Sequence, residues 1–182
     1  MSRVFQICGL PRSGTGFLSA LFNLSPRTVG FHELISTDPN WKETLAKARA
    51  TWDFVADVGT YQFLRGAVIP EATKVFIDRN WWESLDSIRA SIDPDTSKEG
   101  AKQVSDLAQE WVHREKPLVV NYSTLWSIAS LESIWHYCFE EEERFPFEKA
   151  GLLLQMNVQR ENPRNLFGPA NVDAVKRVQA LL

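Results

Sequence analysis

The sequence predicts an α/β domain of three layers, α/β/α, with a central, mainly parallel sheet. Short apolar runs typical of buried strands alternate with longer segments in which apolar residues recur at helical spacing, and no internal repeat or low-complexity tract interrupts this alternation. The chain has 182 residues, 44% of them hydrophobic, which is enough for one well-buried core and too few to require two. We therefore expect a single domain over residues 1–182.

The first unit predicted from the sequence is a strand, a glycine-rich loop and a helix. Residues 4–8 form a short apolar run of the kind found in buried strands, and apolar residues recur at helical spacing over residues 17–22. A second strand is expected at residues 28–31, and it runs directly into the polar pair His32 and Glu33.

The remaining elements continue the alternation. Residues 36–39, Ser-Thr-Asp-Pro, predict an N-cap with proline at the first helical position, and a helix follows at residues 40–49. Residues 52–58 fit either a strand or an irregular connector. Beyond them we expect a strand at residues 74–78, a helix at 82–92, an exposed loop or mobile lid at 93–100, a helix at 101–115, a strand at 117–121, an amphipathic helical segment at 125–135 and a solvated acidic patch at 140–143.

Composition disfavours several classes of partner. A formal net charge of −3 argues against a general binder of nucleic acid or anionic membranes, which reward an excess of Lys and Arg. No apolar run approaches the roughly 18 residues needed to cross a bilayer, and no targeting pattern stands at the N-terminus. Cys8 and Cys138 form neither a metal-binding spacing nor a disulfide framework. We expect a cytoplasmic protein without a bound metal.

The loop at residues 9–16, Gly-Leu-Pro-Arg-Ser-Gly-Thr-Gly, predicts an anion site. Backbone N–H groups of residues 13–16 would point into the concavity before the helix, where the helix dipole also favours negative charge. The ATP-binding loop carries a lysine and a hydroxyl residue after its last glycine, but here those places hold Thr15 and Gly16. The cationic residue is instead Arg12, two residues before Gly14. The loop therefore lacks the residues that bind a triphosphate and carries its positive charge at a different position.

The segment Pro11-Arg12-Ser13-Gly14-Thr15 resembles the 5′-phosphosulfate-binding loop of the sulfotransferase family, P-[KR]-[ST]-G-T-[TS]. The resemblance implies a P-loop NTPase-like fold and 3′-phosphoadenosine 5′-phosphosulfate as the sulfuryl donor. It also implies that the donor is bound by Arg12, Ser13, Gly14, Thr15, Gly16 and Phe17. Gly16 departs from the second hydroxyl of the family pattern and offers only its backbone N–H.

Arg79 and Ser87 carry a second resemblance. The family binds the 3′-phosphate of its donor with an arginine at the end of a central strand and a serine eight residues later, which is the spacing found here. A planar guanidinium and a hydroxyl suit a phosphate dianion. Alternatively, Arg79 pairs with a neighbouring carboxylate and Ser87 is a surface hydroxyl.

The resemblance weakens toward the C-terminus. Residues 119–125 are similar to a late strand-turn segment of the family, V-x-Y-x-x-L, whose tyrosine and leucine normally pack. The family's Gly-rich basic segment, which closes over the donor, is absent. Four basic residues either replace it or form a plain basic helix surface: Arg160, Arg164, Lys176 and Arg177.

The resemblance implies sulfuryl transfer to a hydroxyl or amine group of a small-molecule or carbohydrate acceptor. Arg12 cannot realistically release its proton, so we expect it to act electrostatically. The base should lie at the end of a neighbouring strand, where Glu33 is favoured and His32 is the second choice. The alternatives are that Glu33 is a solvated carboxylate or a partner of Arg12, and that His32 is structural.

Aromatic side chains could line the acceptor cleft, which we expect between the loop and residues 34–72 and 93–115. The candidates are Trp41, Trp52, Tyr61, Trp81 and Trp82. His113 and His136 lie on expected helices and are interpreted as structural.

Two other functions remain open from the sequence. A P-loop small-molecule kinase or NTPase would use Asp78, at the end of an apolar run, to hold magnesium. A non-catalytic nucleotide-binding protein of the same fold would keep the anion site without the reaction.

Overall fold

The computed structural model describes residues 2–60, 62–65 and 68–156. Its described strands form one sheet in the order β2-β3-β1-β4-β5, and every neighbouring pair is parallel. The strands are β1 (Arg3–Gly9), β2 (Thr28–His32), β3 (Phe54–Gly59), β4 (Thr73–Asp78) and β5 (Leu118–Asn121). The prediction of an α/β fold around a mainly parallel sheet is therefore confirmed, and the described sheet is parallel throughout.

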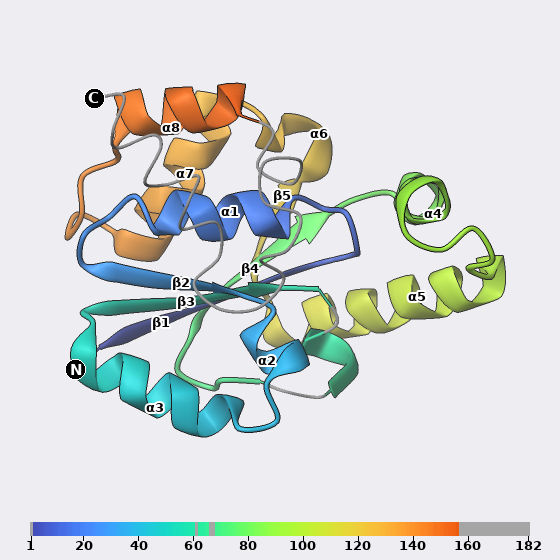
Figure 1. Ribbon diagram of the computed structural model, residues 1–182, viewed down its shortest axis with the longest axis horizontal. Coiled ribbons are helices and arrows are strands. Elements are labelled where there is room, and N and C mark those ends of the chain that lie inside the picture. Colours follow the sequence, from blue (N-terminus) through green and yellow to red (C-terminus); the bar gives the residue numbers. More distant parts are fainter. Residues whose placement is uncertain (1, 61, 66–67, 157–182) are drawn as a thin grey trace.

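Helices lie on both faces of this sheet, an arrangement compatible with three α/β/α layers (Figure 1). One face carries α1 (Thr15–Phe22), α6 (Tyr122–Leu125), α7 (Ile128–Phe139) and α8 (Phe147–Gln155). The other carries α2 (Leu34–Thr37), α3 (Trp41–Thr51), the 3-10 helix η1 (Gln62–Arg65) and α5 (Lys98–Glu115), with α4 (Trp81–Ser91) beyond the end of β4. None of the helices in the described ranges has both the length and the apolar character that crossing a membrane would require.

The segment that sequence alone left undecided, residues 52–58, contains a strand. All six residues of β3 are buried, because the strand lies between β2 and β1 and both of its faces are covered. Alternation of apolar and polar residues arises only where one face of a sheet meets water. Its absence in β3 therefore reflects complete burial, and the polar residue Asp57 is buried with the rest of the strand.

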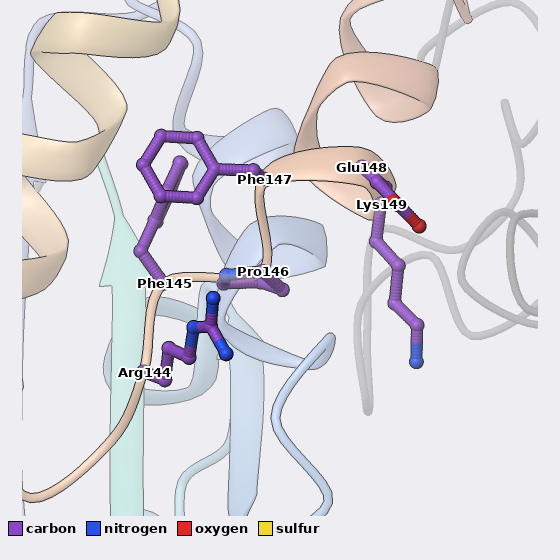
Figure 2. A pocket seen from close by; sticks show the side chains of 6 residues that line it. All are labelled: Arg144, Phe145, Pro146, Phe147, Glu148 and Lys149. Atoms are coloured by element: carbon purple, nitrogen blue, oxygen red, sulfur yellow. The ribbon is translucent and has the colours of Figure 1, made fainter.

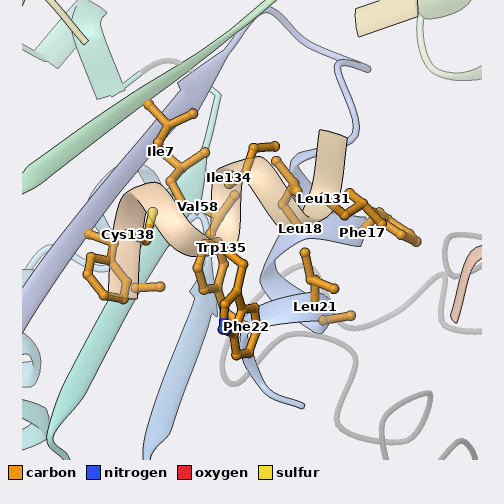
Figure 3. Close-up of a cluster of buried hydrophobic side chains, with 14 of the residues drawn as sticks. Ile7, Phe17, Leu18, Leu21, Phe22, Val58, Leu131, Ile134, Trp135 and Cys138 are labelled. Carbon is orange, nitrogen blue, oxygen red and sulfur yellow. The ribbon is translucent and has the colours of Figure 1, made fainter. Parts of the chain in front are cut away.

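An aromatic cluster joins α1 and α7 to the sheet (Figure 3). The ring of Phe22 stacks on Trp135 at 6.0 Å between centroids, and Phe139 meets the ring of Phe5 on β1 edge-on at 4.9 Å. These side chains are fully buried. Their packing stabilises the position of α1 over the sheet, and therefore of the loop that precedes it.

Helices α3 and α5 form where the sequence predicted helices, but the details of their starts differ from the prediction. The segment at residues 36–39 does not cap a helix: its first two residues belong to α2, and α3 begins at Trp41 after the N-cap residue Asn40. The Asp38 carboxylate instead accepts hydrogen bonds from Asn40 N at 2.7 Å and Thr44 Oγ1 at 2.7 Å. Helix α5 starts at Lys98 rather than at residue 101, because Ser97 accepts a hydrogen bond from Gly100 N and caps it. The predicted exposed loop is accordingly shorter.

A surface pocket of about 350 Å³ lies at the start of α8 and is lined by residues 144–149 (Figure 2). The rings of Phe145 and Phe147 meet edge-on within it at 4.8 Å between centroids. None of the site residues expected from the sequence contributes to its lining.

Candidate functional site

The glycine-rich loop leaves the carboxyl end of β1 and enters α1 at Thr15. Strand β1 lies between β3 and β4, so the loop stands at the edge where ligands bind in parallel α/β sheets. Gly14 is the N-cap of α1 in the left-handed conformation, with φ +84°, and provides no side chain to cap the helix. The N–H groups in a first helical turn lack partners within the helix, which makes such a turn suitable for an anion.

Two glycines of the loop cannot carry a side chain without displacement of their neighbours. A Cβ atom on Gly14 would lie 2.9 Å from Leu125 Cδ2, and one on Gly9 would lie 2.2 Å from Ser13 Oγ. The Ser13 hydroxyl is completely buried and has no hydrogen-bond partner among the described residues. A buried hydroxyl without a partner is costly, so Ser13 has hydrogen-bonding capacity that a ligand could use.

On the side of the loop toward β4 lies a group of residues that we call the guanidinium side: Arg12, Arg79, Ser87 and Tyr122. Arg12 Nε donates to Ser87 Oγ at 3.2 Å, and Arg79 Nη1 donates to the carbonyl oxygen of Arg12. The Arg79 guanidinium also lies over the ring of Tyr122, with its Cζ atom 4.2 Å from the centroid. Arg79 and Ser87, expected at the 3′-phosphate site, therefore lie close to Arg12 of the 5′-phosphosulfate loop, but Ser87 bonds to Arg12 rather than to Arg79.

The carboxylate expected as an alternative partner of Arg79 is Glu83, one turn away on α4. Glu83 Oε2 lies 3.9 Å from Arg79 Nε, and Arg79 Nε itself is buried without a hydrogen bond among the described residues. The ion pair is therefore loose, while the guanidinium is held by the loop and by Tyr122. Beside it is a polar pocket of about 490 Å³, whose lining includes Asp78 and Arg79.

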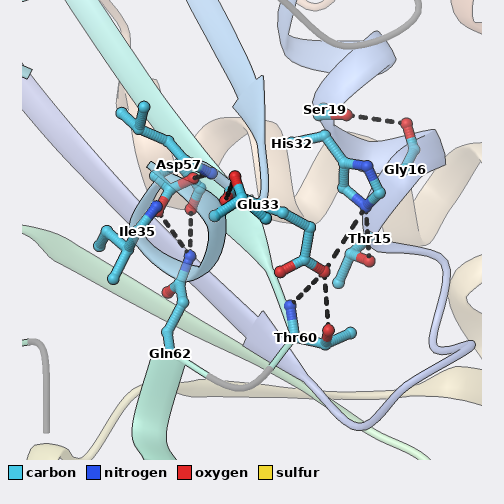
Figure 4. Close-up of polar contacts among 11 residues, drawn as sticks. Thr15, Gly16, Ser19, His32, Glu33, Ile35, Asp57, Thr60 and Gln62 are labelled. Atoms are coloured by element: carbon cyan, nitrogen blue, oxygen red, sulfur yellow. Dashed lines mark hydrogen bonds and ion pairs between the residues drawn. The ribbon is translucent and has the colours of Figure 1, made fainter. Parts of the chain in front are cut away.

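On the side of the loop toward β2 and β3 lies a second group, the carboxylate side: His32, Glu33, Asp57 and Thr60 (Figure 4). Glu33 Oε1 accepts two hydrogen bonds from Thr60, from the backbone N and from Oγ1, both at 2.7 Å. His32 Nε2 lies 3.8 Å from Glu33 Oε1 and 3.3 Å from Thr15 Oγ1 of α1. Thr15 therefore connects the glycine-rich loop to His32, and His32 lies beside Glu33.

Burial lowers the pKa of His32 below its usual value, and the nearby Glu33 carboxylate opposes this shift. An imidazole with a lowered pKa is neutral near pH 7, so one of its ring nitrogens can accept a proton. Both candidate bases therefore lie at the end of β2 beside the loop, and either of them could accept a proton there.

Asp57 is a site residue that sequence reasoning missed. It is fully buried on β3, and its carboxylate accepts hydrogen bonds from Leu34 N at 2.9 Å, Ile35 N at 3.1 Å and Gln62 Nε2 at 2.8 Å. Burial raises the pKa of Asp57 to about 7, against the backbone hydrogen bonds, which lower it. An aspartate within the apolar run Phe-Val-Ala-Asp-Val-Gly was the available signal.

Other expected residues have different surroundings. Phe17 is 5% exposed and packs against Trp126 at 5.2 Å between ring centroids, as part of the core. Trp52 precedes β3 and so lies at the sheet edge opposite the loop. Trp81 and Trp82 stack on each other at 4.2 Å. Trp41 packs beside the apolar cluster under α3, and His113 and His136 are exposed on α5 and α7. Tyr61, Arg160, Arg164, Lys176 and Arg177 lie outside the described residues.

Within the described part of the chain, no group of three or more His, Cys, Asp or Glu side chains is arranged to hold a metal ion. Comparison with known proteins found no similarity from which a family could be assigned: no family model, no curated protein and no solved structure matches this chain.

Proposed function

We propose that this protein is a sulfotransferase that moves a sulfuryl group from 3′-phosphoadenosine 5′-phosphosulfate to a hydroxyl or amine group of a small-molecule or carbohydrate acceptor, on a P-loop NTPase-like fold. The observation that carries the proposal is the position of the Pro-Arg-Ser-Gly-Thr loop. It lies at the end of the central strand, with Arg79 and Ser87 on one side and the pair His32 and Glu33 on the other. Sulfuryl transfer requires an anion site and a base on either side of one reacting centre.

The residues of the loop fit a phosphosulfate group. Gly9 and Gly14 let the loop pack closely against Ser13 and Leu125, where a Cβ atom would clash, and Ser13 Oγ is buried without a partner among the described residues. Arg12 uses its Nε for Ser87, which leaves its two Nη groups to oppose negative charge on a leaving phosphate oxygen. When bound, the donor supplies the activated sulfuryl group; the protein supplies the donors that hold its anionic groups.

Glu33 suits the role of base. Thr60 holds its Oε1 with two hydrogen bonds, while Oε2 receives none from the described residues. A carboxylate fixed through one oxygen can accept the proton of an acceptor hydroxyl at the other. His32 lies between Thr15 and Glu33. It then orients the Glu33 carboxylate and remains the second candidate for the base.

Calorimetry with 3′,5′-adenosine diphosphate and 5′-adenosine monophosphate, followed by transfer of labelled sulfate from the donor to a broad acceptor panel, tests the proposal. We expect the doubly phosphorylated nucleotide to bind more tightly than the monophosphate and to bind in excess chelator. We also expect measurable transfer of labelled sulfate to an acceptor of the panel. Equal affinity for both nucleotides would contradict a 3′-phosphate site. Magnesium-dependent ATP turnover would favour a kinase, and tight binding without any transfer would favour a non-catalytic nucleotide-binding protein.

A further inference from the structure

Glu33 adopts a backbone conformation that requires support. Its φ of +66° lies in the left-handed region, which side chains other than glycine rarely adopt and which persists only where the surrounding structure enforces it. Strand β3 supplies support before the turn, because Glu33 N donates to Val58 O at 3.1 Å. The chain after the turn needs a second attachment if the Glu33 side chain is to keep its direction.

Asp57 supplies that attachment. Its two carboxylate oxygens accept hydrogen bonds from the two N–H groups that directly follow Glu33, those of Leu34 and Ile35. Asp57 is one residue before Val58 on β3, so a single strand holds the turn from both sides. Figure 4 shows Asp57 on one side of Glu33, together with Ile35 and Gln62, and His32 and Thr60 on the other side of Glu33.

The Asp57 carboxylate is itself fixed. Gln62 Nε2 donates to it at 2.8 Å, and Gln62 Oε1 accepts from the Cys8 thiol at 2.8 Å. Gly59 provides the room beside it, since a Cβ atom there would lie 2.9 Å from Glu33 Oε2 and 3.0 Å from Gln62 Nε2. A four-residue helix such as α2 has little stability of its own, so its first turn depends on such contacts with the rest of the fold.

The geometry points to Asp57 as a positioning residue that acts through the backbone of residues 34 and 35 to aim the Glu33 carboxylate at His32 and Thr60. The inference rests on the proposed role of Glu33 as the base. Asp57 does not touch the reacting atoms; it sets where the base stands. Loss of its two backbone hydrogen bonds should let the turn relax and move the Glu33 carboxylate away from His32.

The test uses the pKa of His32 as a reporter of the Glu33 position, measured by NMR titration of the full chain. Because the Glu33 carboxylate raises the pKa of His32 against desolvation, Glu33→Gln should lower that pKa and so calibrate the measurement. Asp57→Asn leaves one acceptor oxygen for the two backbone N–H groups, so it should lower the His32 pKa in the same direction but by less than Glu33→Gln. The exposed His113 and His136 serve as internal references.

Asp38→Asn is the matched control. The substitution makes the same chemical change, and Asp38 also accepts a backbone N–H, but it lies at the far end of α2. The His32 pKa should stay as in the original protein in this variant, and in the double variant Glu33→Gln, Asp57→Asn it should equal the Glu33→Gln value. An unchanged His32 pKa in folded Asp57→Asn overturns the inference. If that variant does not fold, Gln62→Met removes one donor to Asp57 and should give a smaller shift of the same sign; no shift there also overturns it.

Activity gives a separate outcome. With sulfuryl transfer, Asp57→Asn should lower kcat about 10- to 100-fold, within the contribution expected of a positioned base, with donor KM changed less than twofold. It should cause no further loss in the Glu33→Gln background. Additive losses, or a matching loss of donor affinity, would contradict positioning through Glu33. The NMR titration needs no substrate, so a protein without transfer activity would refute the proposed function and still decide the role of Asp57.

Discussion

The two sides of the loop are built in different ways. On the carboxylate side, Asp57 is fully buried and holds backbone N–H groups, and Thr60 holds Glu33 through its own backbone and hydroxyl. On the guanidinium side, Arg12 contacts a partly exposed serine hydroxyl, and Arg79 lies against a partly exposed tyrosine ring. The first set is part of the fold. In the second set, the bond between Arg12 and Ser87 can be exchanged for contacts with a ligand without rearrangement of the sheet, whereas Arg79 also holds the loop through the carbonyl oxygen of Arg12.

This difference predicts that changes on the carboxylate side affect chemistry and folding, whereas changes on the guanidinium side affect ligand affinity. The largest effect should come from Glu33→Gln. Loss of a general base is expected to lower kcat for sulfuryl transfer by about 100- to 10,000-fold, with the affinity for 3′,5′-adenosine diphosphate unchanged. Steady-state kinetics and calorimetry measure the two quantities, and Glu43→Gln on the exposed face of α3 is the control. If nucleotide affinity fell by as much as the rate, Glu33 would contribute to nucleotide binding as well as to chemistry, and the contrast between the two sides would be wrong.

The buried Asp57 should make stability depend on pH. In the folded protein it keeps its proton up to about pH 7, whereas in the unfolded chain it releases it near its ordinary pKa of 3.8. The unfolded state is therefore increasingly favoured as pH rises between these values, and the free energy of unfolding falls by roughly 4 kcal/mol, at about 1.4 kcal/mol per pKa unit.

Denaturant unfolding at several pH values between 4 and 8 measures this dependence in the original protein and in Asp57→Asn. The decline should be absent or much reduced in the variant. His32 acts in the opposite direction, because its pKa is lowered on folding, and the neighbouring Glu33 is present in both proteins. The difference between the two curves therefore reports mainly the carboxyl group of Asp57, with a smaller part from the lowered pKa of His32 that we expect in the variant. Parallel curves would show that burial does not raise the pKa of the Asp57 carboxyl as expected.

On the guanidinium side, Arg79→Ala should weaken binding of 3′,5′-adenosine diphosphate by about 2 to 4 kcal/mol, because one phosphate loses a charged partner. Binding of adenosine 5′-phosphosulfate, which lacks the 3′-phosphate, should hardly change. Calorimetry with both nucleotides measures the contrast, and Arg114→Ala, an exposed arginine on α5, is the matched control. Equal losses for both nucleotides would remove Arg79 from the 3′-phosphate site.

Sequence patterns predicted the parts of the molecule whose signals are local. The strand, loop and helix around Gly14 form one continuous segment, and Arg79 follows an apolar strand directly, so both could be located at the carboxyl edge of the sheet. The bond between Arg12 and Ser87 joins residues 75 positions apart, and no pattern in either segment indicates it.

The same reason explains why Asp57 was missed. Its role depends on N–H groups 22 and 23 residues earlier in the chain, and these lie beside it only because β2 and β3 pair in one register. The wrong N-cap at residues 36–39 has a related cause. The Asp-Pro pattern is typical of a helix start, but the short helix α2 already occupies residues 34–37, which leaves Asn40 as the cap of α3.

Gly14→Ala tests whether the loop conformation is needed in the absence of ligand. An alanine at φ +84°, with its Cβ 2.9 Å from Leu125 Cδ2, should cost about 1 to 3 kcal/mol of stability, measured by denaturant unfolding. Gly151→Ala on α8 is the control, because a Cβ there meets nothing within 4 Å and helical alanine should stabilise by about 0.5 to 1 kcal/mol. Similar values for both substitutions would mean that the loop tolerates other conformations.

The smallest expected effect comes from Ser13, and it tests whether this residue serves ligand binding or the fold. Ser13→Ala removes a buried hydroxyl that has no partner among the described residues, so the free energy of unfolding should stay the same or rise slightly. If that hydroxyl serves a bound phosphosulfate, affinity for adenosine 5′-phosphosulfate should fall by about 0.5 to 1.5 kcal/mol, the net value of one hydrogen bond. Ser133→Ala, an exposed serine on α7, should change neither quantity. A destabilised Ser13→Ala protein with unchanged affinity would assign Ser13 to the packing of the loop. Substitution of a side chain that serves a ligand lowers affinity, whereas substitution of one that serves the fold lowers stability.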